Sequence, residues 1–395
     1  GHVRRTPLLN SPFLDDIAGR RVWVKPECLQ HTGSFKFRGG WSAVSALEPS
    51  VRAKGVIAFS SGNHAQGVAF MCSHFGVKGV IFMPVTTPQQ KIQKTKMFGG
   101  LQVEVRLIGD YFDKTLAAAQ QYCVEEGAHF LSPFDDEDVI EGQASVAVEI
   151  EEQLGRVPDH ILLPVGGGGL SSGVYSYFQN ACRYSFVEPE GAPSLAKALV
   201  AGAPVDVSPI NSFVDGAAVA KIGQRNFARL DRVAESDVIH LAEDRICVTI
   251  IEMLNVEGIV LEPAGALSIE ALGEVADQIK GKTVVCVASG GNFDFERLPE
   301  VKERAQRYSG VKKYFILRMP QRPGALKEFL SILGPDDDIC RFEYLKKSAR
   351  NFGSVLIGIE TRSPDSFGPF LAQLKDAGFT YTDITNDETL AQFVL

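Results

Sequence analysis

The chain has 395 residues, of which 45% are hydrophobic and 22% charged, so it can bury more than one core and is unlike a disordered protein. A formal net charge of −8, with no dense run of Lys and Arg among aromatic residues, argues against nucleic-acid binding. The seven cysteines lie far apart and form no C-x-x-C pair. This excludes the common zinc and redox motifs and predicts a reduced, cytoplasmic compartment.

Short apolar runs alternate with longer amphipathic ones between residues 21 and 288, as in a parallel sheet flanked by helices. The clearest expected strands cover residues 56–59, 79–82, 161–163 and 283–287. Helices are expected at 88–98 and 138–154, where proline or an acid precedes the apolar pattern and glycine follows it. Residues 161–182 are uncharged, but their glycines and polar side chains predict a buried strand, loop and helix, so we expect no membrane partner.

The pattern changes near residues 308–312 and becomes strand, helix, strand, strand, helix, strand, which is the ferredoxin-like order. The expected elements are 313–319, 324–333, 339–347, 354–360, 367–377 and 379–384. We therefore expect a catalytic domain over 1–308, with a smaller subdomain at about 40–135 inserted in it, and a second domain over 312–395.

Three loops rich in glycine and serine each follow an expected strand. Open parallel sheets bind ligands at the carboxyl edge of their strands, so we expect the three loops to lie together at one sheet edge. Loop 164–170 precedes a helix and has four consecutive glycines, which favours a phosphate at the helix N-terminus. A tight turn, or a loose dinucleotide fingerprint completed by Glu188, remains an alternative. Loop 60–67 suits a carboxylate or a plain helix cap, and loop 288–292 alone is typical of a turn.

Lys36 lies in a segment where Ser34 can cap a helix, which places the lysine in the first helical turn. The helix dipole disfavours a cation there and should lower the pKa of the amine. A neutral amine is what Schiff-base chemistry requires. By itself one lysine of many would be a solvated surface charge, but the three nearby ligand loops favour a catalytic role.

These motifs together resemble the fold-type II pyridoxal-phosphate family, which has a tryptophan synthase β-like fold, and within it the biosynthetic threonine ammonia-lyases (threonine dehydratases). The resemblance implies an α/β catalytic domain with two open parallel-sheet subdomains, followed by a ferredoxin-like α+β, ACT-like regulatory domain. The residues that carry it are Lys25-x-Glu27-x-x-Gln30, Gly33-Ser34-Phe35-Lys36-x-Arg38-Gly39, 60–67, 166–170 and 289–292, with 319–326 and 341–345 in the second domain.

The resemblance implies pyridoxal 5'-phosphate as cofactor, bound as a Schiff base on Lys36. It places Phe35 and Gly216 beside the ring, Asn63 on the 3'-oxygen and Ser289 at the pyridine nitrogen. The phosphate cradle would be Gly166, Gly167, Gly168, Gly169 and Leu170. The substrate carboxylate would be held by Ser60, Ser61, Gly62, Asn63 and His64, with Ser61 also a catalytic candidate.

No metal is expected, because the cation site of some relatives maps to Glu188, Ala192 and Ser194, and Ser194 has no carboxylate. The resemblance also implies a homo-oligomer, a tetramer, with isoleucine or valine as effectors of the second domain.

Ser289 predicts the class of reaction. A neutral hydroxyl leaves the pyridine nitrogen largely unprotonated, so the ring is a weaker electron sink and loss of a β-substituent is favoured over transamination. The expected reaction converts L-threonine to 2-oxobutanoate and ammonia, the first step of isoleucine biosynthesis. A serine dehydratase or serine racemase of the same fold is the first alternative. An amino-acid-sensing protein and a Rossmann oxidoreductase are the others.

Overall fold

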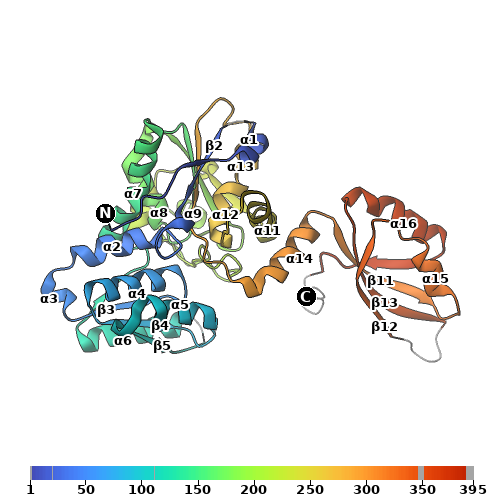
Figure 1. Ribbon diagram of the computed structural model, residues 1–395, viewed down its shortest axis with the longest axis horizontal. Coiled ribbons are helices and arrows are strands. Elements are labelled where there is room, and N and C mark those ends of the chain that lie inside the picture. The colour runs from blue at the N-terminus through green and yellow to red at the C-terminus, as the bar shows by residue number, and fades with distance from the viewer. Residues whose placement is uncertain (1, 20, 111, 346–350, 388–395) are drawn as a thin grey trace. The chain divides into compact units, whose positions relative to one another are not determined.

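The computed structural model describes residues 2–19, 21–110, 112–345 and 351–387. It divides into two compact units, Gly1–Phe295 and Glu296–Leu395 (Figure 1). The first unit contains two sheets and the second contains one. Within the described residues, no helix is both long and apolar enough to cross a membrane.

The larger sheet of the first unit has six strands in the order β1-β2-β10-β7-β8-β9. Their bounds are Leu9–Asn10 (β1), Val22–Pro26 (β2), Val284–Ala288 (β10), His160–Pro164 (β7), Arg183–Pro189 (β8) and Val238–Leu241 (β9). β1 is antiparallel to β2, and every other pair is parallel. The carboxyl ends of β2, β10 and β7 therefore lie side by side, and the loops that follow these strands meet at one edge.

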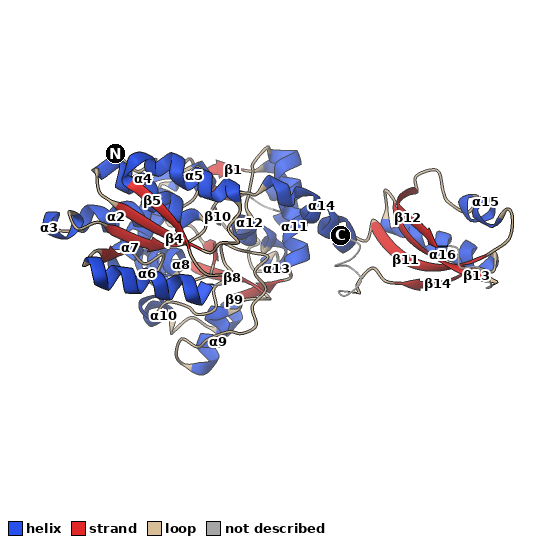
Figure 2. Cartoon of the chain, turned by 90° about the horizontal axis from the view of Figure 1, so that it is seen from below, coloured by secondary structure: helices blue, strands red, loops and turns tan. Residues whose placement is uncertain are grey.

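The smaller sheet is parallel and has the order β5-β4-β3-β6. Its strands are Val103–Leu107 (β5), Gly79–Met83 (β4), Val56–Phe59 (β3) and His129–Phe130 (β6). Because side chains alternate along a strand, Ala58 packs in one core with α4 (Asn63–Phe75), while Ile57 packs in another with α6 (Phe112–Glu126). Figure 2 shows these strands between helices.

The strands predicted within the first unit are confirmed as β3, β4, β7 and β10, although β10 starts and ends one residue later than predicted. The uncharged segment 161–182 forms β7, a loop and α8 (Gly169–Phe178), as expected. The predicted helix 138–154 is α7 (Glu137–Leu154), where the Asp136 side chain accepts from the Val139 N–H and Gly155 ends the helix with a left-handed φ of 69°. Helix α5 (Gln89–Gly99) starts one residue later than predicted, because Pro88 is its N-cap.

The expectation that three ligand loops share one sheet edge is wrong in one respect. The loops after β7 and β10 belong to the larger sheet, but the loop after β3 belongs to the smaller sheet. Length and apolar pattern cannot reveal this, because parallel strands of either sheet have the same appearance in a sequence.

The second unit has an antiparallel sheet in the order β12-β13-β11-β14, which confirms the ferredoxin-like prediction. Its strands are Lys312–Pro320 (β11), Asp338–Leu345 (β12), Phe352–Glu360 (β13) and Thr380–Asp383 (β14), with helices α15 (Ala325–Leu330) and α16 (Phe367–Asp376) packed on one face. Helix α14 (Leu298–Tyr308) also belongs to this unit. The last two residues of the expected strand 339–347, and residues 388–395, lie outside the described residues.

Candidate active site

One pocket of the first unit brings together the segment after β2, the loop after β7 and the loop after β10. Its lining residues are Phe35, Lys36, Pro164, Gly166, Gly167, Gly168, Gly169, Leu170, Gly216, Ala217, Ala264 and Ser289. All the residues that the sequence assigned to the phosphate, the ring faces and the pyridine nitrogen are in this set. The loop from Ser60 to His64 is outside it.

Backbone hydrogen bonds hold the segment before Lys36 against the loop after β10. Phe35 N donates to Ser289 O at 3.0 Å, and Gly291 N donates to Gly33 O at 2.9 Å. Gly33 has a left-handed φ of 79°, which an L side chain would strain. Helix α2 (Lys36–Ala46) then begins at Lys36 itself.

The predicted cap by Ser34 is wrong. The N-cap residue of α2 is Phe35, without a side-chain cap, and the Ser34 hydroxyl is a buried polar atom that has no partner among the described residues. The backbone bridge between Ser34 and Gly290 explains this, because the segment adopts a strand-like pairing with the neighbouring loop.

Lys36 is half-buried, and its amine donates to the backbone carbonyl of Pro133 at 2.6 Å. The rings of Phe35 and Phe134 lie 5.2 and 5.6 Å from Nζ. Burial lowers the pKa of Lys36 to about 8, although the nearby Glu262 opposes this effect. The direction agrees with the sequence prediction, but its main cause is burial and not the helix dipole.

The glycine loop forms a cradle into which side chains cannot extend. A Cβ on Gly167 would lie 2.2 Å from the Phe134 ring, and one on Gly166 would lie 2.9 Å from the Cα of Ala217. Gly168 has a left-handed φ of 88°. The loop leads directly into α8, whose first N–H groups have no partners within the helix, so the cradle suits a phosphate.

Asn226, which the sequence analysis did not identify, fixes the glycine loop by hydrogen bonds. Asn226 donates through Nδ2 to the Gly167 carbonyl at 2.7 Å and to the Phe134 carbonyl at 3.0 Å. Its Oδ1 accepts from the Ser172 hydroxyl at 2.8 Å. Asn226 thus ties the loop after β6 to the loop after β7.

Glu262 is a second residue that the sequence did not reveal. It is buried, its Oε1 atom accepts from Asn63 Nδ2 at 2.6 Å, and a Cβ on Gly290 would lie 2.1 Å from that oxygen. Burial and the neighbouring Asp215 raise the pKa of Glu262 to about 7, while the bond from Asn63 lowers it. Nothing but a glutamate before a proline marks this position in the sequence.

The loop from Ser60 to His64 is compact. The Ser60 hydroxyl accepts from Gly62 N at 3.1 Å, and Ser61 is half-buried. His64 Nε2 lies 2.9 Å from the Leu131 carbonyl oxygen, and burial together with the Lys36 charge lowers the pKa of His64 to about 3. The imidazole is therefore neutral at physiological pH, and the partner of its Nε2 is backbone.

The positions considered for a cation are closed by protein groups. Glu188 is buried at the end of β8 and accepts from Leu195 N at 2.7 Å, from Ala196 N at 3.0 Å and from the Ser194 hydroxyl at 3.3 Å. Burial raises the pKa of Glu188 to about 7. No group of three or more His, Cys, Asp or Glu residues that could hold a metal ion occurs in the described part of the chain.

These residues fit pyridoxal 5'-phosphate. A buried amine of lowered pKa, an N-terminal helix cradle for a phosphate and the Ser289 hydroxyl at the end of β10 all face one pocket. Each matches one functional group of that cofactor.

Comparison with known proteins agrees with this fit. Residues 1–290 match the family model described as pyridoxal-phosphate dependent enzyme, and residues 303–394 match the C-terminal regulatory domain of threonine dehydratase. The chain is 43% identical over 397 residues to the biosynthetic L-threonine dehydratase of Bacillus subtilis, covering 100% of this chain and 94% of that protein.

Among solved structures, threonine deaminase isoform 2 of Solanum lycopersicum is similar with a TM-score of 0.72 and 36% identity, over 77% of this chain and 88% of that one. Maize serine racemase is similar with a TM-score of 0.70 and 27% identity, over 78% of this chain and 94% of that one.

Proposed function

The chain belongs to the family of pyridoxal-phosphate-dependent enzymes, and we propose that it is a biosynthetic threonine dehydratase that holds its cofactor on Lys36. It converts L-threonine to 2-oxobutanoate and ammonia, which is the first step of isoleucine biosynthesis. The observation that carries the role of Lys36 is its buried amine, of pKa about 8, in one pocket with the glycine cradle.

The bound cofactor supplies an electron sink for the electrons of the substrate Cα–H bond. Lys36 Nζ takes this proton, because its lowered pKa leaves a larger neutral fraction near neutral pH than an ordinary lysine has. The Pro133 carbonyl, which accepts from Nζ, and the flanking Phe35 and Phe134 rings restrict the positions that the amine can reach.

The remaining residues bind and orient. Gly166, Gly167, Gly168, Gly169 and Leu170 hold the phosphate at the start of α8, Phe35 and Gly216 flank the ring, Ser289 meets the pyridine nitrogen and Asn63 the 3'-oxygen. A neutral partner such as Ser289 favours elimination over transamination. The substrate carboxylate binds at Ser60, Ser61, Gly62, Asn63 and His64, where N–H groups at the start of α4 point outward, and Ser61 is the candidate for a catalytic hydroxyl in this loop.

The test is the absorption spectrum of the purified protein with pyridoxal phosphate, followed by keto-acid release from L-threonine. Lys36→Ala should lose the visible band of the bound cofactor and the activity, whereas Lys54→Ala, at an exposed lysine, should retain both. A Lys36→Ala protein that keeps the band and the activity contradicts the proposal.

Serine is the competing substrate, since the chain is also similar to a serine racemase. One methyl group in a pocket is worth about 1–3 kcal/mol, so the preference has to be measured as a ratio of kcat/KM for threonine and serine. A ratio below one, or formation of D-serine in a chiral assay, would reassign the reaction.

We propose that the second unit acts as a regulatory domain with isoleucine or valine as effectors, and that the enzyme works as a homo-oligomer, a tetramer by its resemblance to the family. The family match over residues 303–394 supports the regulatory domain. Threonine saturation curves with and without each amino acid, together with light scattering, test both statements. Curves that neither amino acid changes would remove the regulatory role.

A further inference from the structure

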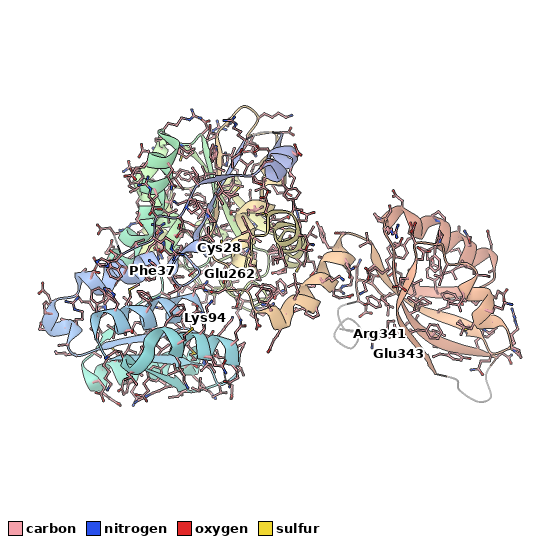
Figure 3. All side chains as sticks on the ribbon, in the orientation of Figure 1. Cys28, Phe37, Lys94, Glu262, Arg341 and Glu343 are labelled. Atoms are coloured by element: carbon pink, nitrogen blue, oxygen red, sulfur yellow. The ribbon has the colours of Figure 1, made fainter. Side chains whose placement is uncertain are left out.

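Four side chains form a line of hydrogen bonds in the first unit. The line starts at Lys94, on a helix that packs against the smaller sheet, and ends at Glu262. Lys94, on α5, donates to Asn292 Oδ1. Asn292 Nδ2 donates to Asn63 Oδ1 at 2.6 Å, and Asn63 Nδ2 donates to Glu262 Oε1 at 2.6 Å. Figure 3 labels the two ends of the line, Lys94 and Glu262.

The ammonium of Lys94 sets the direction of every bond in the line. An ammonium such as that of Lys94 can only donate, so the oxygen of the Asn292 amide must face it. The Asn292 nitrogen then donates to Asn63 and also to the Thr32 carbonyl at 2.8 Å, which uses both of its hydrogens. Because the Asn292 nitrogen donates to it, Asn63 must turn its oxygen to Asn292, and its nitrogen then faces Glu262, whose Oε1 accepts.

The direction of these hydrogen bonds determines which group of the Asn63 amide remains free to bind a ligand. Its oxygen accepts from Asn292 and one hydrogen of its nitrogen is donated to Glu262, which leaves one N–H. The amide flipped by 180° would set oxygen against a carboxylate and nitrogen against nitrogen, so the line disfavours it strongly. A remaining N–H is the group that an anionic oxygen requires, whereas a carbonyl oxygen would repel it.

We propose that Lys94, Asn292 and Glu262 are positioning residues that hold the Asn63 amide in the one orientation that leaves an N–H for the cofactor's 3'-oxygen. The inference rests on the proposed function, since it assigns a task to residues around the cofactor. It extends the site beyond the pocket lining to a buried carboxylate and to a lysine of the smaller sheet's helix layer.

The surroundings of the line support this role. Gly33 and Gly290 both lie where a Cβ would collide with it, at 2.6 Å from Asn292 Oδ1 and 2.1 Å from Glu262 Oε1. A Cβ on the pocket-lining Gly216 would lie 3.6 Å from Glu262 Oε1, so the carboxylate adjoins the pocket. The charged groups that act on Glu262 are Asp215, Lys91, Lys94 and Lys36.

The main test compares Glu262→Leu with Glu262→Gln in the full-length protein, using the dissociation constant of pyridoxal phosphate and the pH titration of its absorption band. Leucine cannot accept the Asn63 bond, so it should weaken the cofactor about tenfold, or ~1.4 kcal/mol. It should also shift the titration midpoint in the direction that Asn63→Ala does. Glutamine keeps an acceptor oxygen and should stay close to wild type.

A double-mutant cycle tests whether Glu262 affects cofactor binding through Asn63. If Glu262 acts through Asn63, the Asn63→Ala/Glu262→Leu protein is no worse than Asn63→Ala alone. Additive losses overturn the proposal, and so does a Glu262→Gln protein that falls as far as Glu262→Leu, because charge and not orientation would then matter.

A second test changes Lys94, at the other end of the line, and leaves the buried acid Glu262 in place. Lys94→Met should shift the titration midpoint in the same direction by a smaller amount, while Lys96→Met, at an exposed position on the same helix, should not. Equal behaviour of these two variants overturns the role of Lys94, even if Glu262→Leu fails to fold. Cofactor binding and threonine turnover by the wild type are measured first, so their failure would count against the proposed function and not against the line alone.

Discussion

The first unit contains two clusters of polar side chains that differ in how their buried acids are neutralised. Near the start of α2, Arg38 binds Glu27 at 2.7 Å and Glu149 at 2.8 Å, and Lys25 binds Glu149 at 2.7 Å. These four residues form the ion network, with two cations for two carboxylates. In the line from Lys94 to Glu262, by contrast, the buried acid is bonded by the neutral amide of Asn63.

The difference shows in the pKa values. Burial alone would raise the pKa of Glu149, but Arg38 and Lys25 hold it below its usual value. For Glu262, burial and Asp215 outweigh the amide bond and raise the pKa to about 7. A charge-compensated network resists titration and anchors the scaffold, whereas an acid held by an amide can titrate near neutral pH. The comparison teaches that burial alone does not distinguish a structural acid from one that serves a site.

Breaking the ion network should have the largest effect. Arg38→Leu leaves Glu27 and Glu149 without their guanidinium, and removing one partner of a buried ion pair costs about 3–5 kcal/mol. Denaturant unfolding of the apo-protein should show this loss, with Arg21→Leu, at an exposed arginine, as the control. Equal midpoints for the two variants would mean that the network contributes nothing to stability.

The contributions of Glu262 and Glu149 to the free energy of unfolding should change with pH in opposite directions. The pKa of Glu262 is raised in the folded state, so its contribution to the free energy of unfolding is present below about pH 4.5 and is lost as pH rises through about 7. The pKa of Glu149 is lowered, so its contribution is lost as pH falls.

Unfolding of apo wild type and Glu262→Gln at pH 5 and pH 7.5 measures this. The wild type should lose up to ~3 kcal/mol relative to the variant on going to the higher pH. A difference that does not depend on pH would show that Glu262 stays ionised throughout.

A methyl group in the phosphate cradle should have an intermediate effect. Gly167→Ala places its Cβ 2.2 Å from the Phe134 ring, and overpacking of this kind costs ~1–3 kcal/mol. The dissociation constant of pyridoxal phosphate should rise accordingly. Gly368→Ala adds its methyl group to open space and serves as the matched control. Unchanged affinity in Gly167→Ala would argue against a phosphate in this loop.

The smallest expected effect concerns Glu188, another buried acid. Its oxygens already accept from Leu195, Ala196 and Ser194, so we expect that it holds no divalent cation. Extensive treatment with a chelator should leave kcat/KM for threonine unchanged. Loss of activity that Mg²⁺ or Ca²⁺ restores would show that these hydrogen bonds give way to a metal.

The parts of the site that could be predicted have local signatures. Consecutive glycines between a strand and a helix mark the cradle, and Lys36 stands out by its position at a helix start. Pro133, which binds Lys36, is 97 residues away, and Glu262 is 199 residues from Asn63. A backbone carbonyl, an asparagine such as Asn226 and an ordinary glutamate carry no local pattern, so their partners become visible only when the chain is folded.

The sequence by itself determined the parallel strands, the glycine loops, the ferredoxin-like order of the second unit and the candidacy of Lys36, because each depends on periodicity or on short contiguous motifs. Only the tertiary structure decided that burial lowers the pKa of Lys36. It also decided that Glu262 ends a directed line of hydrogen bonds. Desolvation and hydrogen-bond direction arise between residues far apart in the chain, and no local pattern encodes them.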